Sequence, residues 1–499
     1  MLNMPPKTLS KSRFIAGMQC EKRLWLEVHD HTLADEIDDL TQGLFDQGHE
    51  VGDLAQSLYP GGVLITEDYL HIPQAVETTE KVVQAGAPTL YEATAIHDRY
   101  MARADILHQV EPGSNEWDII EVKSATKVKN EYLYDLAIQK YIFEGAGYSI
   151  RKTILCHLNN QYIRKGPLEI GELFTLSDET DKVNRLAVKI NLMTEKLLQV
   201  VDSTTVPEIP IGGRCDKPYG CPFIGHCWKN IPEDSVFTLI NGRELSDDLY
   251  QRGIVKIADI PQATSLSTKQ RRQVEVAQTN EPYWGFKGVN MFLKELEYPL
   301  HFLDFEGYNP AIPPYDSIRP FQQTPFQFSV HIQEKPGAEL IHYEFLPTGE
   351  GDPRETLMKK LLEAIGPTGS VIVYYAQYEA GVIRNLAELF PKHNAPLQSI
   401  IDRISDLIAP FKSRDILYPD FLGSASLKSI LPVLVPDMTY KGMGIGEGGA
   451  ASMAYVKLID PKVSKAVKDK IRKDLLAYCG QDTLAMVKIY EVLSAKVKG

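Results

Sequence analysis

Four acidic residues and one tyrosine in the C-terminal part of the chain have the types and spacing of a metal-binding site. Asp304 and Glu306 are two residues apart in FLDFE, so on a strand both side chains project from one face. Tyr478 and Asp482 are four apart in YCGQD, so on a helix they also share a face. Glu379 follows the apolar run VIVYYAQ. Carboxylates on separate elements can hold two divalent metal ions about 4 Å apart, while the tyrosine hydroxyl orients the water that attacks a phosphodiester.

The order of these motifs resembles that of the DEDDy exonucleases, which are proofreading and RNase D-like 3′-5′ enzymes with an RNase H-like fold. A DxE strand comes first, an acid after a second strand follows, and a YxxxD helix comes last. The segment GSASLKSILPVL is also similar to a helix that precedes the last motif in that family. The resemblance implies Mg²⁺ or Mn²⁺ at the four acids and cleavage from 3′ ends. The family has Asp where this chain has Glu379, and Asp402 and Asp406 are alternatives for that ligand.

A second set of charged residues lies in the N-terminal half. Asp105, in ADIL, is followed sixteen residues later by the EVK of Glu121 and Lys123, which share one face of a strand. Two carboxylates can hold Mg²⁺ or Mn²⁺ through oxygen ligands, and a lysine can stabilise charge on a phosphate. A bare D…ExK pattern is frequent by chance, so an ordinary ion pair on a surface hairpin is the alternative.

The sequence around this second set resembles the RecB-like branch of the PD-(D/E)xK nucleases, which have a restriction-endonuclease-like fold. The similar segments are IIEVKSAT and the helix DLAIQKYIFEGAG. The resemblance implies that Asp105, Glu121 and Lys123 are catalytic and that Gln139 joins them from the following helix. His49, in GLFDQGHEVGDLA, matches a helical histidine that ligates metal in many members, although alone it is typical of an ordinary helix face.

Four of the six cysteines predict a third site. Cys215, Cys221 and Cys227 have the spacing C-x5-C-x5-C, and Cys20 lies far upstream. Thiolate clusters in a reducing compartment bind zinc or iron–sulfur clusters, although three loop cysteines without metal are the simpler interpretation. The layout resembles that of the CRISPR-associated RecB-like nucleases and the AddB nuclease domain. That resemblance implies a [4Fe–4S] cluster that clamps the two ends of the domain together, with zinc as the alternative.

The elements that must position these residues predict an α/β protein with three parts. Residues 1–230 are expected to form the RecB-like PD-(D/E)xK domain, with strands over 89–93, 100–109, 117–124 and 151–158 and a helix over 131–144. Residues 231–295 are expected to form a helical connector. Residues 296–499 are expected to form the RNase H-like DEDDy domain. Its predicted strands cover 301–308, 326–333, 341–347 and 370–377, and its predicted helices cover 354–366, 402–411 and 462–497.

Length and composition limit the class of protein. A chain of 499 residues is too long for one hydrophobic core, and 43% apolar with 24% charged residues is typical of folded domains. The net charge of −13 argues against a protein that coats nucleic acid through positive charge, but it leaves metal-dependent nucleases open. No stretch approaches the roughly 20 apolar residues of a membrane span, and the N-terminus lacks the apolar core of a signal peptide. We therefore expect a cytoplasmic protein with no membrane partner.

Together these features predict a two-site, metal-dependent nuclease that acts on nucleic acid, with single-stranded DNA as the expected substrate. Nearly the whole chain resembles an uncharacterised bacterial family that fuses a RecB-like domain to a DEDDy-like domain. DNA repair, recombination or defence against foreign DNA would suit such an enzyme. One alternative is an RNA-processing 3′-5′ exonuclease whose N-terminal domain only binds nucleic acid. Another is a non-catalytic nucleic-acid-binding scaffold.

Overall fold

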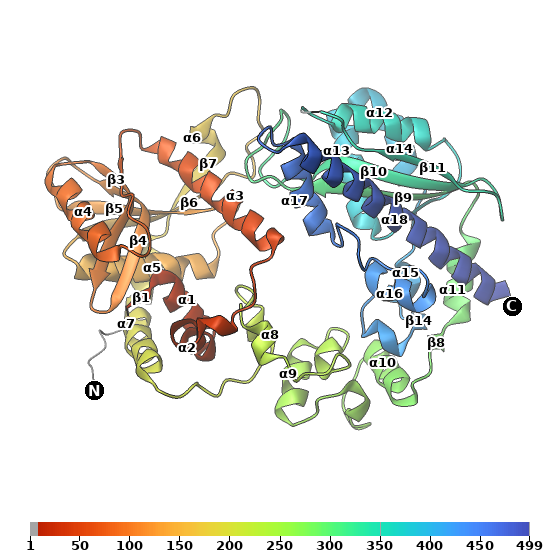
Figure 1. The fold of residues 1–499 in the computed structure, drawn as a ribbon, viewed down its shortest axis with the longest axis horizontal. Coiled ribbons are helices and arrows are strands. Elements are labelled where there is room, and N and C mark those ends of the chain that lie inside the picture. Colours follow the sequence, from red (N-terminus) through yellow and green to blue (C-terminus); the bar gives the residue numbers. More distant parts are fainter. Residues whose placement is uncertain (1–7, 350, 499) are drawn as a thin grey trace. The chain divides into compact units, whose positions relative to one another are not determined.

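A computed structural model describes residues 8–349 and 351–498 and confirms the expected α/β class. The chain divides into two compact units. Unit 1 comprises Met1–Asn230 together with Pro310–Phe321, and unit 2 comprises Ile231–Asn309 together with Gln322–Gly499. Each unit has its own mixed β-sheet with helices packed on it (Figure 1).

The sheet of unit 1 has seven strands in the order β2-β3-β4-β5-β6-β7, with β1 beside β4. The strands are β1 (Leu9–Ser10), β2 (Val63–Leu64), β3 (Thr89–His97), β4 (Tyr100–Gln109), β5 (Glu116–Lys123), β6 (Ser149–Leu158) and β7 (Phe174–Asp178). β3, β4 and β5 are antiparallel neighbours, whereas β5 and β6 are parallel. A parallel pair needs a crossover, which the helix α5 (Asn130–Gly145) provides.

Alternating side chains give this sheet two apolar faces. Leu107 and Ile119 face the larger core, which also contains residues of α1 (Lys11–Gln19), α5 and α7 (Thr180–Asp202). Their neighbours Ile106 and Ile120 face a second core that includes residues of α3 (Asp39–Ala55). Strands buried on both faces consist mainly of apolar residues, so a charged residue near the end of β4 or β5 stands out as a candidate for function.

The main sheet of unit 2 has five strands in the order β11-β10-β9-β12-β13. They are β9 (Leu300–Tyr308), β10 (Thr324–Gln333), β11 (Ile341–Phe345), β12 (Val371–Val373) and β13 (Ile404–Asp406). β9, β10 and β11 are antiparallel, and β12 is parallel to both β9 and β13.

The two-residue period of β9 determines which side chains meet which helices. Leu303 and Phe305 join the core formed with α12 (Arg354–Ala364) and α13 (Ala376–Leu389). Phe302 joins the core formed with the long C-terminal helix α18 (Lys465–Lys498). Since Asp304 and Glu306 alternate with the first pair, they project toward α18.

Two element predictions in unit 2 were wrong. The expected helix over 402–411 contains the strand β13, and only the short helix α15 (Ala409–Lys412) follows it. Parallel pairing with β12 outweighs the local helical pattern there. The expected strand over 370–377 ends at Val373, because Tyr375 has a φ of 89° and α13 begins at the next residue.

Residues 231–295 contain the helices α9 (Arg243–Gln251), α10 (Thr268–Thr279) and α11 (Phe286–Lys294), and they belong to unit 2. A small apolar core around Leu249, Ile260 and Val274 holds the first two helices together. The strand β8 (Tyr283–Trp284) pairs with β14 (Ile416–Leu417), which ties this segment to the rest of unit 2.

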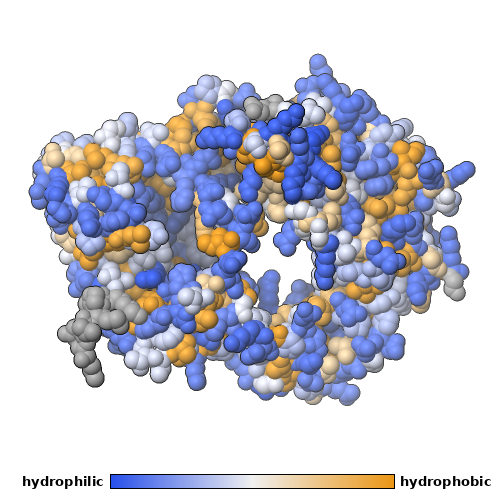
Figure 2. Space-filling view, viewed as in Figure 1, coloured by the Kyte–Doolittle hydropathy of each residue, from blue (hydrophilic) through white to orange (hydrophobic). Residues whose placement is uncertain are grey.

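The surface is largely hydrophilic. Figure 2 shows that apolar residues on the visible face form separate small patches between charged and polar ones. Within the described residues, every helix is too short or too polar to cross a membrane.

Candidate metal centres

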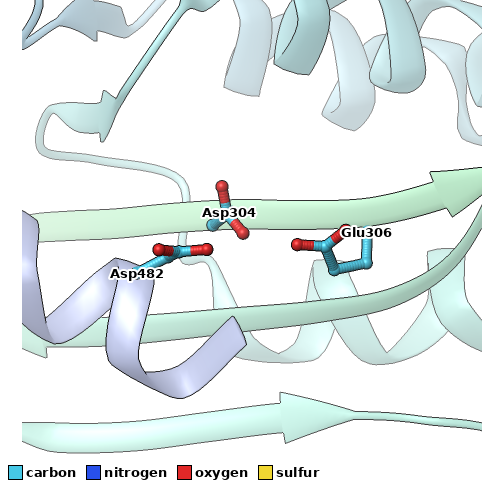
Figure 3. A group of neighbouring side chains, drawn as sticks. All are labelled: Asp304, Glu306 and Asp482. Atoms are coloured by element: carbon cyan, nitrogen blue, oxygen red, sulfur yellow. The ribbon is translucent and has the colours of Figure 1, made fainter. Parts of the chain in front are cut away.

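The structure brings three of the four predicted C-terminal acids together. Asp304 and Glu306 extend from β9, and Asp482 extends from α18 (Figure 3). One carboxylate oxygen of each lies within 4.8 Å of the other two. Across residues 8–349 and 351–498, this triad is the one group of three or more His, Cys, Asp or Glu side chains that meets this spacing.

Glu379, the fourth predicted acid, lies in the first turn of α13 and is 2% exposed. Glu379 does not belong to the triad whose oxygens lie within 4.8 Å of one another, but it interacts electrostatically with the triad members. Burial raises the pKa of Glu379 well above its usual value, and repulsion from Asp304 and Glu306 raises it further. In the described part of the chain, no hydrogen-bond donor reaches its buried Oε2 atom. Such an oxygen is costly unless a cation or a proton neutralises it.

The pKa values of the three triad carboxylates are also raised. Burial, followed by repulsion from Asp482, raises the pKa of Asp304 well above its usual value. Burial and the two aspartates do the same to the pKa of Glu306, and burial raises the pKa of Asp482 to about 6. Lys428, on α16 (Leu427–Leu434), opposes these shifts only in part. Buried carboxylates in this excess are suited to hard divalent cations, which take oxygen ligands.

Two tyrosines support Asp482. Tyr478, one turn earlier on α18, is 3% exposed and stabilises the ionised Asp482 through a side-chain hydrogen bond. The Tyr440 hydroxyl donates a second hydrogen bond to Oδ1 of Asp482. The Lys428 ammonium lies 5.1 Å from the ring centre of Tyr478 and 5.6 Å from that of Tyr440. Sequence analysis identified Tyr478 but missed Tyr440 and Lys428.

The two alternative ligands lie elsewhere. Asp406, at the end of β13, accepts hydrogen bonds from the backbone N–H groups of Tyr375 at 3.0 Å and Ala376 at 3.1 Å. Asp402 is exposed and accepts from the side chain of Gln398 at 2.7 Å. Asp406 therefore holds the start of α13, the helix that carries Glu379, and neither aspartate joins the triad.

The N-terminal candidates meet where the middle of β4 lies beside the C-terminal end of β5. Oδ2 of Asp105 accepts from the backbone N–H of Val122 at 2.6 Å. The Lys123 ammonium lies 2.8 Å from Oε1 of Glu121 and 2.5 Å from Oδ2 of Asp135, a residue of α5 that sequence analysis missed. Burial, with repulsion from Glu121, raises the pKa of Asp105 to about 7.

Glu121 is surrounded by donors. Gln139 donates to its Oε2 at 2.7 Å, and the Lys11 ammonium lies 2.8 Å from its Oε1. Burial alone would raise the pKa of Glu121, but Lys11 and Lys123 outweigh burial and hold it at about 2. Lys11 comes from the start of α1, 110 residues away in sequence, and no motif pointed to it.

His49 lies on α3, and its side chain is exposed. Among the residues that the structure describes, it forms no close ligand group with Asp105 and Glu121. Its role as a metal ligand therefore stays a prediction that depends on the family resemblance.

The four cysteines Cys20, Cys215, Cys221 and Cys227 line a single small cavity, and all are free thiols. Cys20 caps the end of α1, whereas the other three come from the segment that ends with α8 (Ile224–Cys227). Burial raises the pKa of Cys221 to about 11. Within the described residues, no three of these four sulfur atoms all lie within 4.8 Å of one another.

The fold and these sites define an α/β protein with a buried carboxylate centre. Residues 301–426 match a family described as a domain of unknown function, DUF2779. The matched segment contains Asp304, Glu306 and Glu379 and ends before Tyr478 and Asp482. The uncharacterized protein UU173 of Ureaplasma parvum serovar 3 is 26% identical over 222 residues, which cover 40% of this chain. The match covers 32% of that relative, so this chain spans about a third of its length.

Proposed function

We propose that the chain is a metal-dependent nuclease with two separate sites, one in each unit. The observation that carries this proposal is the buried triad of Asp304, Glu306 and Asp482 beside the unpartnered Oε2 of Glu379. Three buried carboxylates and the partly buried Asp304, all with raised pKa values, are unfavourable together unless cations bind them.

The proposal for unit 2 is a DEDDy-type 3′-5′ exonuclease with an RNase H-like fold. Its support is the origin of the acids: two from the central strand β9, one from the first turn of α13 and one from α18. Three antiparallel strands followed by two parallel ones give the sheet a direction change beside β9, which also agrees with this fold. Glu379 stands where the DEDDy family has Asp; it still offers a hard oxygen ligand, on a side chain one methylene longer than that of Asp.

In this mechanism the protein supplies positioning and electrostatics. Divalent metal ions, when bound, stabilise charge on the phosphate and lower the pKa of water. Asp304, Glu306 and Asp482 would hold those ions, and the Tyr478 hydroxyl would orient the attacking water. Tyr440 keeps Asp482 in place, and the Lys428 ammonium beside the two tyrosine rings would supply a counter-charge for phosphate.

The proposal for unit 1 is a PD-(D/E)xK nuclease site. Asp105, Glu121 and Lys123 lie on the adjacent strands β4 and β5, and Gln139 on α5 donates a hydrogen bond to Glu121. The antiparallel strands β3 to β5, followed by a crossover helix and a parallel strand, agree with the restriction-endonuclease-like core that the resemblance implies. Asp105 and Glu121 would hold metal, and Lys123 would stabilise the phosphate.

We further propose that the four cysteines hold a [4Fe–4S] cluster. The support is the donor set: four thiols of one cavity, from both ends of unit 1. Zinc bound to four thiolates at about 2.3 Å needs the sulfur atoms about 4 Å apart, which is closer than the present spacing. A larger cluster suits the wider arrangement, and it would tie the end of α1 to α8.

Nucleic acid is the proposed substrate, with single-stranded DNA as the first expectation and RNA as the alternative. One observation favours a second function for unit 1, in which it only binds nucleic acid. Both oxygens of Glu121 already accept hydrogen bonds from side-chain donors. In that case unit 2 would be the sole nuclease of the chain.

The experiment compares wild-type protein, Lys123→Ala and Asp304→Ala, all purified without oxygen. Each is incubated with Mn²⁺ and with 5′- or 3′-labelled single-stranded DNA and RNA. Two working sites predict that each variant loses a different set of products. Loss of products in Asp304→Ala alone would favour the binding role of unit 1. Cleavage that is unchanged in both variants, or absent from the wild type, would refute the proposal.

A further inference from the structure

Lys11 is the first residue of α1, and the chain fixes its position on both sides. Leu9 and Ser10 form β1 and pair in parallel with β4. The Ser10 hydroxyl caps α1 by accepting from the backbone N–H of Arg13 at 3.2 Å. Leu9 and Phe14 are fully buried in the main core of unit 1. The Lys11 side chain therefore projects from a firmly anchored helix start.

The Lys11 ammonium contacts the carboxylate on which the N-terminal site depends. It lies 2.8 Å from Oε1 of Glu121, the same oxygen that Lys123 approaches to 2.8 Å. Gln139 donates to Oε2 at 2.7 Å. The side chain of Glu121 is 2% exposed. A metal ion that binds Oε1 must displace one of the two lysines from that oxygen.

Two of the three donors are held by further contacts. Lys123 also pairs with Asp135 at 2.5 Å, and Gln139 is completely buried. Within the described residues, Glu121 is the single carboxylate at ion-pair distance from Lys11. The Lys11 side chain is 18% exposed, so its released ammonium can reach solvent or a phosphate beside the site.

We propose that Lys11 is a phosphate-binding residue that exchanges partners: it pairs with Glu121 before metal binds, and it contacts a nucleic-acid phosphate afterwards. This inference rests on the proposed nuclease function of unit 1. The physical basis is competition, because an ammonium and a divalent cation both require the negative charge of Oε1. Each released lysine that meets a phosphate also displaces a condensed counterion from the nucleic acid. Lys11 is therefore a switch in charge pairing that links metal loading to substrate binding.

The first test measures Mn²⁺ binding to the full chain by calorimetry. Asp304→Ala and Asp482→Ala are introduced together, so that binding at the C-terminal triad does not obscure the N-terminal site. In this background Lys11→Met should bind Mn²⁺ about tenfold more tightly, since the competing charge is gone. Lys11→Arg should bind it more weakly, because a guanidinium forms stronger paired hydrogen bonds with a carboxylate. Equal affinities in all three proteins, or the reverse order, would overturn the exchange.

The second test measures binding of a labelled single-stranded oligonucleotide in Ca²⁺ at several salt concentrations. Loss of one phosphate contact in Lys11→Met should reduce the slope of log affinity against log salt by about 0.7, whereas Lys11→Arg should keep it. An unchanged slope in Lys11→Met would overturn the phosphate contact. Circular dichroism verifies folding, and Lys11→Gln replaces Lys11→Met if that variant unfolds.

Together with the cleavage assay, the two tests distinguish the role of Lys11 from the proposed nuclease function of unit 1. If all the proteins bind Mn²⁺ equally and Lys123→Ala loses its products, the nuclease function stands and the role of Lys11 is wrong. If no variant binds Mn²⁺ at the N-terminal site and no product depends on Lys123, the nuclease function of unit 1 fails and the inference fails with it.

Discussion

In unit 1, Oε1 of Glu121 lies 2.8 Å from each of two lysines, whereas in unit 2 the carboxylates of Asp304, Glu306 and Asp482 lie within 4.8 Å of one another. The consequence is a pKa of about 2 for Glu121 and raised pKa values for the triad. Glu121 is thus held as an anion by the protein itself. The triad needs protons or external cations to offset its repulsion.

Carboxylate ligands can therefore await metal in two ways: by repelling one another, or by pairing with lysines of the protein. The C-terminal acids are preorganised by the sheet and α18, so metal binding removes repulsion and should stabilise unit 2 directly. In unit 1, Glu121 is already neutralised by two lysines, so metal binding to it must compete with internal ion pairs. Unit 2 should therefore load metal more tightly than unit 1.

The largest expected effect is on the C-terminal reaction. Asp304→Ala removes one triad ligand and should lower 3′-end cleavage by roughly 10³-fold. The matched control is Asp402→Ala, since Asp402 is exposed and lies outside the triad. Its rate should stay within about twofold of the wild type in a gel assay with 5′-labelled single-stranded DNA. An equal loss of 3′-end cleavage in Asp304→Ala and Asp402→Ala would show that the triad has no special role in the reaction.

The cysteine site should matter to unit 1 alone. Cys20 ends the helix that begins with Lys11, so loss of a cluster at Cys20 should loosen the N-terminal site. Cys20→Ala should lose bound iron and about 10²-fold of the Lys123-dependent cleavage. The Asp304-dependent cleavage should not change. Cys215→Ala should reproduce this result, and iron content together with product analysis measures it. Undiminished Lys123-dependent cleavage of nucleic acid by a protein without iron would contradict the proposed structural role of the cluster.

In the metal-free protein, a Glu→Gln substitution should change the stability of the two units in opposite directions. Glu121→Gln removes the anion between two lysines and should destabilise unit 1 by about 3 kcal/mol. Glu379→Gln removes a buried carboxyl whose raised pKa costs stability at neutral pH, so it should stabilise unit 2 by about 1 kcal/mol. Thermal unfolding in a metal chelator measures both substitutions, which are chemically identical. The same sign in both variants would mean that the two sites do not differ in charge compensation.

The smallest expected effect concerns Tyr440. Tyr440→Phe removes one hydrogen bond to Asp482 and should lower 3′-end cleavage by about tenfold, with little change in substrate affinity. Tyr418→Phe is the matched control, because the Tyr418 hydroxyl accepts from Trp284 at 3.3 Å, away from the triad. Steady-state kinetics separates kcat from KM. An unchanged kcat would restrict Tyr440 to a structural role.

Much of the fold was predictable because strand periodicity is local information. The strand over 100–109 and the placement of Asp304 and Glu306 on one strand face are confirmed. The helix over 402–411 was wrong, since β13 owes its form to pairing with β12. Lys11 and Tyr440 were not predictable. They approach Glu121 and Asp482 from 110 and 42 residues away, and no short motif records such contacts.

A crystal structure of the full chain grown with Mn²⁺, with anomalous diffraction used to locate the metal, tests the carboxylate centre most directly. We expect a strong anomalous peak bound by Asp304, Glu306 and Asp482, and a weaker peak at Asp105 and Glu121. Absence of a peak at the triad in fully formed crystals with millimolar Mn²⁺ would contradict the central claim that this carboxylate centre binds catalytic metal.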